Sequence, residues 1–181
     1  MIKLSWGEVE AAAAQLAQKI KDSGFDPDCL IGITTGGLFP LAMLAKRMDD
    51  KAIYTVTTKR HWNDTDDWID IKYMPQVDLE GRSVLLIDEI THVGTTIQTI
   101  AEVLRTRYKV GVVKTATLAA NHDVNDFRPD FHVLAEQGDW LLFPWEDDSE
   151  FEEYDLHLPY ENTASVIAAR TPEKADIASV L

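Results

Sequence analysis

Residues 84–96 read VLLIDEITHVGTT, and the rest of the chain is organised around this stretch. Its first four residues are aliphatic, which is typical of a strand buried on both faces of a parallel sheet. Two carboxylates, Asp88 and Glu89, follow at the predicted end of the strand, and a turn with Gly94 comes next. From Thr95 onward, apolar residues recur every three or four positions, which predicts a helix.

This strand–turn–helix arrangement suits a ligand that carries both a phosphate and hydroxyl groups. The helix N-terminus and the free N–H groups of the turn favour a phosphate, whereas the carboxylates favour hydroxyls or a metal ion. The stretch is not a Walker A loop, because neither Gly-Lys-Thr nor Gly-Lys-Ser follows the strand. It is not a dinucleotide-binding fingerprint either, because Gly-x-Gly-x-x-Gly is absent.

The composition indicates one globular domain. The chain has 181 residues, of which 45% are hydrophobic, enough for a sizeable core. Its net charge of −14 disfavours nucleic acid and anionic membrane surfaces as partners. Seven acidic residues between positions 146 and 155 supply about half of that charge, and either a solvated face or a docking segment would explain them.

The sequence also predicts a cytoplasmic protein. No apolar run is long enough to span a membrane, and the N-terminus lacks the apolar core of a signal peptide. The single cysteine, Cys29, lies in a predicted strand and has no partner for a disulfide, so a reducing compartment is expected.

Strands alternate with helices along the chain, which predicts an α/β fold with a central, mostly parallel sheet flanked by helices. Ser5 and Glu8 have the spacing of a capping box, so a helix should begin at Trp6. A second strand–turn–helix segment contains Gly36 and Gly37. The further expected elements are strands at 29–33, 53–57, 110–118, 131–134 and 141–143, a helix from Pro40 through Met48, and a helical segment at 164–169. Residues 58–77 are polar and aromatic, so they are expected to form an excursion over the site.

Residues 84–96 resemble the motif that binds phosphoribosyl diphosphate (PRPP) in type I phosphoribosyltransferases: an aliphatic strand, two acids, and a turn of small and hydroxyl residues around a glycine. Residues 31–40 are similar to the pyrophosphate loop of that family. Residues 140–146, WLLFPWE, resemble the C-terminal segment of small xanthine–guanine and related purine members. The resemblance covers roughly residues 3–146 in order, so chance agreement of one motif does not explain it.

The resemblance implies a single phosphoribosyltransferase-like domain over residues 1–181, with a small hood and a peripheral C-terminal tail. The hood would come from about 58–77 and 138–160. The implied activity is Mg²⁺-dependent transfer of phosphoribose from PRPP to a nucleobase, with a 6-oxopurine as the expected base and pyrophosphate as the second product. Dimers are common in the family, so the resemblance is compatible with a homodimer, but the sequence itself does not determine the oligomeric state.

The resemblance also assigns roles to residues. Asp88 and Glu89 would hold the ribose hydroxyls, directly or through Mg²⁺, and would stabilise positive charge at the anomeric carbon. The implied 5-phosphate contacts are Thr91, Gly94, Thr95 and Thr96; the implied pyrophosphate contacts are Thr34, Thr35, Gly36, Gly37, Lys59 and Arg60; and the implied base contacts are Trp140 and Asn121.

Three positions depart from the pattern of the purine enzymes. His92 stands where those enzymes usually carry an Asp that manages a proton on the base, and a histidine could do proton work near neutral pH. Thr35 replaces an Arg of many pyrophosphate loops, and Asn121 aligns with the Lys that holds the purine oxygen. Two alternatives therefore stay open. One is a regulatory protein that binds PRPP or a nucleotide with little or no base transfer, and the other is an enzyme with an unusual acceptor.

Overall fold

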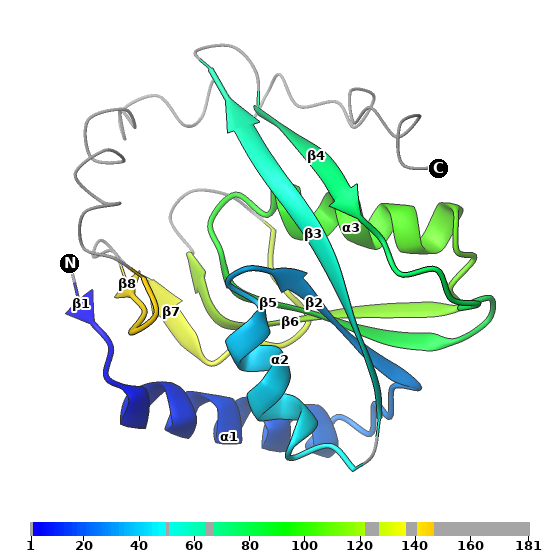
Figure 1. Cartoon of the computed structure of the whole chain (residues 1–181). Coiled ribbons are helices and arrows are strands. Elements are labelled where there is room, and N and C mark those ends of the chain that lie inside the picture. The colour runs from blue at the N-terminus through cyan, green and yellow to red at the C-terminus, as the bar shows by residue number, and fades with distance from the viewer. Residues whose placement is uncertain (1, 50, 64–66, 122–126, 137–140, 147–181) are drawn as a thin grey trace.

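The structure is a computed structural model, and it describes residues 2–49, 51–63, 67–121, 127–136 and 141–146 (Figure 1). The elements in chain order are β1 (Ile2–Lys3), α1 (Trp6–Asp22), β2 (Cys29–Thr34), α2 (Leu38–Ala45), β3 (Ala52–Trp62), β4 (Asp67–Tyr73), β5 (Ser83–Thr91), α3 (Thr95–Thr106), β6 (Val112–Asn121), β7 (Leu134–Glu136) and β8 (Leu141–Leu142).

A six-stranded sheet in the order β4-β3-β2-β5-β6-β7 forms the centre of the described part of the chain. Its neighbouring strands are parallel except for β3 and β4, which form an antiparallel hairpin. A separate two-stranded parallel sheet pairs β1 with β8 and joins two distant parts of the chain. The predicted α/β class with a mostly parallel sheet is therefore confirmed.

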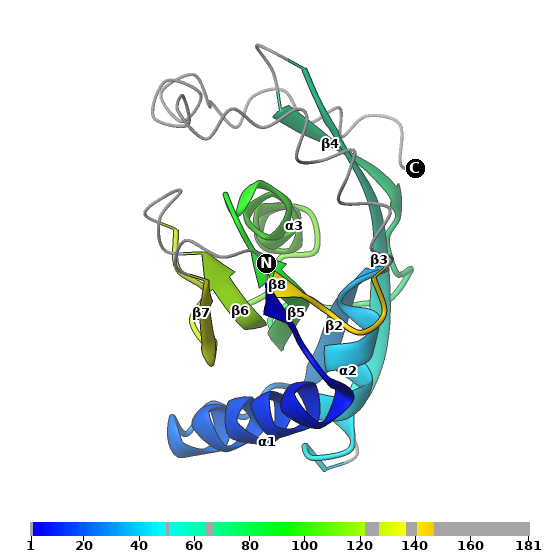
Figure 2. The ribbon, with the colours of Figure 1, turned by 90° about the vertical axis from the view of Figure 1, so that its left-hand side faces the viewer.

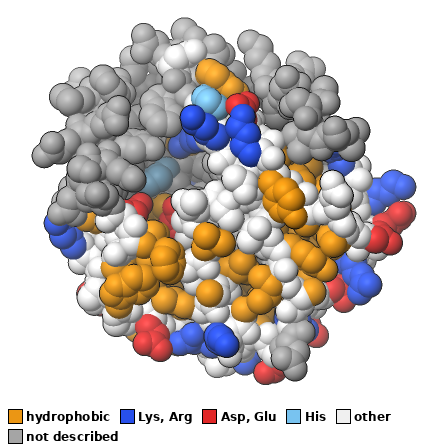
Figure 3. All heavy atoms as spheres, in the orientation of Figure 1, with side chains coloured by type: hydrophobic (Ala, Val, Ile, Leu, Met, Phe, Trp, Pro, Cys, Tyr) orange, Lys and Arg blue, Asp and Glu red, His pale blue; other side chains and the backbone are white. Residues whose placement is uncertain are grey.

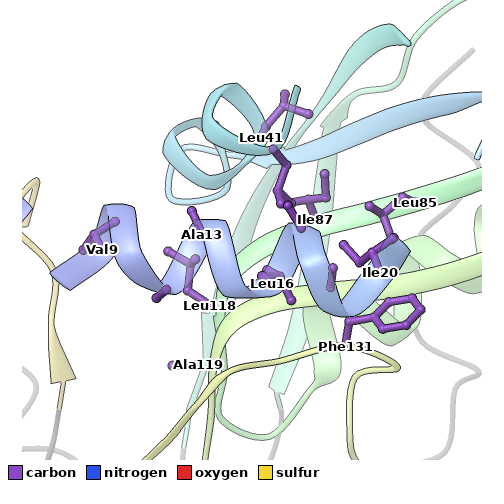
Figure 4. Close-up of a cluster of buried hydrophobic side chains, with 14 of the residues drawn as sticks. Val9, Ala13, Leu16, Ile20, Leu41, Leu85, Ile87, Leu118, Ala119 and Phe131 are labelled. Atoms are coloured by element: carbon purple, nitrogen blue, oxygen red, sulfur yellow. The ribbon is translucent and has the colours of Figure 1, made fainter. Parts of the chain in front are cut away.

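Helix α1 begins where the sequence predicts, at Trp6. The Ser5 hydroxyl accepts the Glu8 N–H at 3.3 Å, and the Glu8 carboxylate accepts the Ser5 N–H at 2.7 Å, which completes the capping box. The apolar stripe of Val9, Ala13, Leu16 and Ile20 packs on the central strands (Figure 4). Among the helices that the structure describes, none is both long and apolar enough to cross a membrane.

Helix α3 covers the opposite face of the sheet from α1 (Figure 2). Its buried Ile97, Ile100 and Leu104 pack in one core cluster with Val84 and Leu86 of β5. The central strands are thus covered on both sides, which explains why β5 opens with an unbroken aliphatic run.

Strand β5 is longer than the sequence predicts. Its pairing with β2 stops at Ile87, but its pairing with β6 continues to Thr91, so Asp88 and Glu89 lie within the strand and not after it. The length of β5 depends on its neighbours in the sheet. Strand β2 leads into its glycine turn and stops pairing with β5, whereas β6 continues to pair with β5.

Other predicted boundaries also move. Helix α2 ends at Ala45, so Met48 is buried in the core cluster but lies beyond the helix. The strand expected at 131–134 is a single bridge between Phe131 and Ala116, followed by β7. The excursion expected at 58–77 contains the end of β3 and all of β4, that is, most of the hairpin. The hood segment at 138–160 falls mostly outside the described residues, and the C-terminal tail and the helical segment at 164–169 fall wholly outside them.

Candidate functional site

The candidate site lies at the carboxyl ends of β2 and β5. From β2 the chain proceeds through α2 to β3 on one side, and from β5 it proceeds through α3 to β6 on the other side. The two neighbouring strands therefore lead in opposite directions, which makes their carboxyl ends a topological switch point of the sheet. Open α/β sheets bind ligands at such points.

The acid pair contacts the glycine turn at this point. A Cβ atom added to Gly36 would overlap the carboxylate of Glu89. The Glu89 N–H donates to Asp88 Oδ1 at 3.0 Å, so the two acids are also joined directly. The Oε2 atom of Glu89 is buried and has no hydrogen-bond partner within the described residues. A buried oxygen of this kind is suited to a hydroxyl or a cation that arrives with a ligand.

Burial, together with the charge of Glu89, holds the pKa of Asp88 well above its usual range. Two adjacent carboxylates in a half-buried position repel one another when both are ionised. A cation between them, or hydroxyl donors from a sugar, would favour the doubly ionised state. The pair thus fits the predicted role in holding ribose hydroxyls, with or without Mg²⁺.

The turn after β2 requires a glycine at position 37. At Gly37 an added Cβ would lie 2.5 Å from Ile33 O and 2.7 Å from Ile87 O, two backbone atoms. The Gly37 N–H donates to Ile33 O at 2.9 Å, so that group is engaged within the turn. A pyrophosphate at this turn would therefore have to use the other donors of the loop.

The two threonines before these glycines differ in their surroundings. The Thr34 hydroxyl donates to the Thr57 hydroxyl on β3 at 3.0 Å, whereas Thr35 is exposed. The peptide bond between Thr34 and Thr35 is cis. The exposed Thr35 remains accessible to a ligand at this edge of the sheet.

The turn from β5 into α3 has the form expected of a phosphate-binding loop. Gly94 is the N-cap of α3 with φ +80°, a conformation that favours glycine. The first N–H groups of a helix have no partner inside it, so they point toward this turn. The Thr91 hydroxyl is buried without a hydrogen-bond partner in the described part of the chain, and Thr96 is partly buried in the first turn. The Thr95 hydroxyl, by contrast, donates to Asp67 at 2.9 Å.

The two predicted cations of the pyrophosphate site lie on β3 and differ in availability. Lys59 is exposed. Arg60 forms a two-bond ion pair with Asp67, with Nε–Oδ1 at 2.7 Å and Nη2–Oδ2 at 3.0 Å. Asp67 was not singled out from the sequence, because it is one of several acids in a polar segment and no local pattern distinguishes it.

The predicted base-binding residues lie at the far side of the same edge. The last pair between β5 and β6 is Thr91 with Ala120; His92 follows Thr91 just beyond β5, and Asn121 ends β6, where it pairs with Glu136 of β7. Asn121 is buried and His92 is partly buried. Trp140, the predicted platform for the base, lies outside the described residues.

The sequence is similar to those of known phosphoribosyltransferases. The model of the phosphoribosyl transferase domain matches residues 4–149. A xanthine-guanine phosphoribosyltransferase of Desulfotalea psychrophila is 27% identical over 149 residues, which cover 82% of this chain and 88% of the relative.

Solved structures share the fold. A purine phosphoribosyltransferase from Pyrococcus horikoshii superposes with a TM-score of 0.72 at 26% identity, covering 81% of this chain and 94% of the other. A hypothetical protein from Neisseria gonorrhoeae, solved with bound ppGpp, superposes with a TM-score of 0.68 at 23% identity, covering 93% and 97%.

Proposed function

The chain belongs to the phosphoribosyl transferase domain family, and from this premise we propose that it transfers phosphoribose from PRPP to a nucleobase and releases pyrophosphate. The observation that carries the proposal is the contact between the acid pair of β5 and the glycine turn of β2, beside the N-terminus of α3. These three features suit the ribose hydroxyls, the pyrophosphate and the 5-phosphate of one PRPP molecule. The xanthine-guanine relatives support a 6-oxopurine as the acceptor.

Asp88 and Glu89 would accept hydrogen bonds from the two ribose hydroxyls. As pyrophosphate leaves, positive charge grows at the anomeric carbon, and the nearby carboxylates lower the energy of that state. The N–H groups of the α3 turn and the Thr91 and Thr96 hydroxyls would hold the 5-phosphate. His92, which follows β5, and Asn121, at the end of the neighbouring strand β6, would face the incoming base, and His92 would accept its proton.

We further propose that Mg²⁺ binds with the substrate. Within the described residues no group of three or more metal-ligating side chains gathers. Mg²⁺ fits this donor set, because it commonly uses one or two carboxylates and completes its coordination with phosphate oxygens and water. Asp88 and Glu89 would hold it, and when bound it would neutralise charge on the leaving pyrophosphate.

A regulatory protein that binds PRPP or a nucleotide is the second candidate. The observation that favours it is the engagement of Arg60 by Asp67, which commits one of the two predicted pyrophosphate cations to a partner within the protein. His92, Thr35 and Asn121, which depart from the purine enzymes, point in the same direction.

Turnover and binding measured together separate the two candidates. The protein is incubated with PRPP, Mg²⁺ and, in turn, xanthine, guanine, hypoxanthine and adenine, while pyrophosphate release is recorded. Release with one of these bases supports the enzyme. Binding of PRPP or ppGpp by calorimetry without release with any base supports the regulatory protein, and the absence of both binding and release contradicts both candidates.

The acid pair is tested with Asp88→Asn combined with Glu89→Gln. We expect PRPP affinity to fall at least tenfold while the melting temperature does not fall, because the variant removes repulsion between two half-buried carboxylates. Asp22→Asn, an exposed acid on α1, is the control for the change in net charge. Unchanged PRPP affinity in the double variant would show that the pair does not hold the ribose.

A further inference from the structure

Three side chains from three elements meet beside the phosphate turn, and we refer to Arg60, Asp67 and Thr95 as the hairpin cluster. Arg60 is on β3, Asp67 opens β4, and Thr95 opens α3. The Asp67 carboxylate accepts two hydrogen bonds from Arg60, at 2.7 Å and 3.0 Å, and one from the Thr95 hydroxyl at 2.9 Å. The cluster therefore joins the β3–β4 hairpin to the first residue of the helix that begins the phosphate turn.

The carboxylate at the centre of this cluster is almost completely buried, since the Asp67 side chain is only 4% exposed. Burying a carboxylate costs several kcal/mol unless charged and hydrogen-bonding partners compensate it. Here a planar guanidinium supplies a two-bond partner, and a hydroxyl supplies a third bond, so the charge is paired where it is buried. Such a group holds its neighbours in a defined geometry.

Asp67 lies at the end of an otherwise apolar face. Asp67, Ile69 and Ile71 alternate along β4 and so point to the same side of the strand. Ile69 and Ile71 are buried, and Ile71 shares a core cluster with Ile97 of α3. Apolar packing thus attaches the base of the hairpin to α3, and the polar contact continues this attachment up to the start of the helix.

The hydrogen bond to Asp67 also determines what Thr95 can do. A threonine hydroxyl has one proton, and in this structure Thr95 donates it to Asp67. Toward any other group the hydroxyl then presents only lone pairs, which repel a phosphate oxygen. The Thr95 side chain is therefore an anchor for the turn, and its backbone N–H is the group left to face a phosphate.

We propose that Asp67 is a positioning residue for phosphate binding: paired with Arg60, it holds the first turn of α3 in place through Thr95. This proposal rests on the proposed function, because it concerns the geometry of the ribose-5-phosphate site. A purely electrostatic role makes the opposite prediction, since removing a negative charge beside a phosphate site would by itself strengthen phosphate binding.

The experiment measures the dissociation constant of ribose 5-phosphate by calorimetry in Asp67→Asn, Thr95→Val and the double variant. We expect each single change to raise the dissociation constant about tenfold, which corresponds to about 1.4 kcal/mol. The double variant should lose little more than the more damaging single one, because both changes act on the contact between Asp67 and Thr95. Thr95→Ser should recover most of the affinity that Thr95→Val loses, since serine keeps the hydroxyl.

Asp70→Asn is the matched control on the same strand. Asp70 accepts from His61 and Lys72, is more exposed than Asp67, and carries the same charge. Its substitution should leave the dissociation constant unchanged or lower it slightly. Valine is close in size to threonine, so Thr95→Val should fold. It therefore tests the contact between Asp67 and Thr95 even if Asp67→Asn does not fold.

Either of two changes in the variants overturns the positioning role, and so does an unchanged affinity in Asp67→Asn. In one, Asp67→Asn strengthens binding as Asp70→Asn does, so that Asp67 acts only through its charge. In the other, the losses in the two single variants add in the double variant, so that they do not share a contact. If the unaltered protein binds neither ribose 5-phosphate nor PRPP, the proposed function fails and this proposal fails with it; binding with unchanged affinity in Asp67→Asn contradicts the positioning role alone.

Discussion

Gly36 and Gly37 are adjacent in the sequence, but an added methyl group would meet different neighbours at each position. At Gly36 it would meet the end of the Glu89 side chain, which can rotate away. At Gly37 it would meet the backbone carbonyls of Ile33 and Ile87, which are held in the sheet. Gly36 therefore leaves space for the Glu89 carboxylate, and Gly37 leaves space for the backbone of the sheet.

Alanine substitutions separate these two effects. We expect Gly36→Ala to change the free energy of unfolding by less than about 1 kcal/mol but to reduce PRPP affinity at least tenfold, because Glu89 must leave its position. We expect Gly37→Ala to lower stability by several kcal/mol, as overpacking against backbone atoms does. Urea unfolding and calorimetry measure the two quantities, and equal loss of stability in both variants would contradict this distinction.

Asp130 has a structural role with a defined pH dependence. It accepts hydrogen bonds from the N–H and hydroxyl of Thr115 at 2.8 Å and 3.0 Å, and from Lys114 Nζ at 2.7 Å. Burial alone would raise the pKa of Asp130, but these hydrogen bonds outweigh it and the pKa lies below its usual value. The ionised carboxylate therefore stabilises the folded state above the unfolded pKa, about 3.9, and this contribution is lost as the pH falls through the folded pKa.

Asp130→Asn should reveal that contribution. At pH 7 we expect the variant to be less stable by about 1–2 kcal/mol, since it loses the charged hydrogen bonds. Below about pH 4 the difference from the unaltered protein should shrink, because Asp130 is then increasingly protonated in the unfolded chain. Urea unfolding at several pH values measures this, with Asp22→Asn as the control. A difference that stays constant from pH 7 to pH 3 would exclude the ionic contribution.

At the scale of elements, α1 is defined by its own sequence. Ser5 and Glu8 satisfy donors at its first turn, and its buried residues form one stripe. Strand β5 is different, because its last residues depend on β6: without that neighbour, Asp88 to Thr91 would have no partner once β2 ends. The acid pair therefore owes its position to a strand contributed by a later part of the chain.

The capping box of α1 can be measured directly. We expect Ser5→Ala to lower the free energy of unfolding by about 1 kcal/mol, because one N–H group at the helix start loses its partner. Gln18→Ala, an exposed position in the same helix, should change it by less than about 0.5 kcal/mol. If both variants unfold at the same urea concentration as the unaltered protein, the cap does not contribute to stability.

At the scale of the whole molecule, distant parts of the chain are joined by an aromatic cluster. Ile2 pairs with Leu141, and close to this small sheet Trp6, Phe39, Phe143 and Trp145 contact one another. Phe39 and Phe143 stack on Trp145 with ring centroids 4.5 Å and 4.8 Å apart. Hydrophobic side chains gather on one face of the molecule (Figure 3). Of the residues near this cluster, Ile2, Trp6, Leu38 and Phe39 are exposed.

Phe143 should contribute most to this cluster. It is 1% exposed, so Phe143→Ala leaves a cavity, and we expect a loss of about 3–5 kcal/mol in the free energy of unfolding. Phe39, at 37% exposed, serves as the comparison, and Phe39→Ala should cost less than half as much. Chemical denaturation checks both values. Equal losses would mean that ring stacking on Trp145, and not burial in the core, accounts for the contribution of the cluster to the free energy of unfolding.

The sequence alone was enough to predict the fold class and the segments that meet at the candidate site. Apolar periodicity, the capping box and the glycine turns are local patterns, and they identified α1, α3, β2, the start of β5 and the two turns that meet at the switch point. The roles of Asp88, Glu89 and the residues of both turns in binding PRPP stay predictions, as do the hood and the base contacts.

Only the tertiary structure decided which side chains touch. Three features each join residues from different elements. They are the extension of β5 beside β6, the Glu89 carboxylate over Gly36, and the hairpin cluster. Local patterns record how a segment folds against its own neighbours in the chain, because capping and periodicity act over a few residues. They do not record which carboxylate will contact a guanidinium from another strand, since that depends on which strands are neighbours in the sheet.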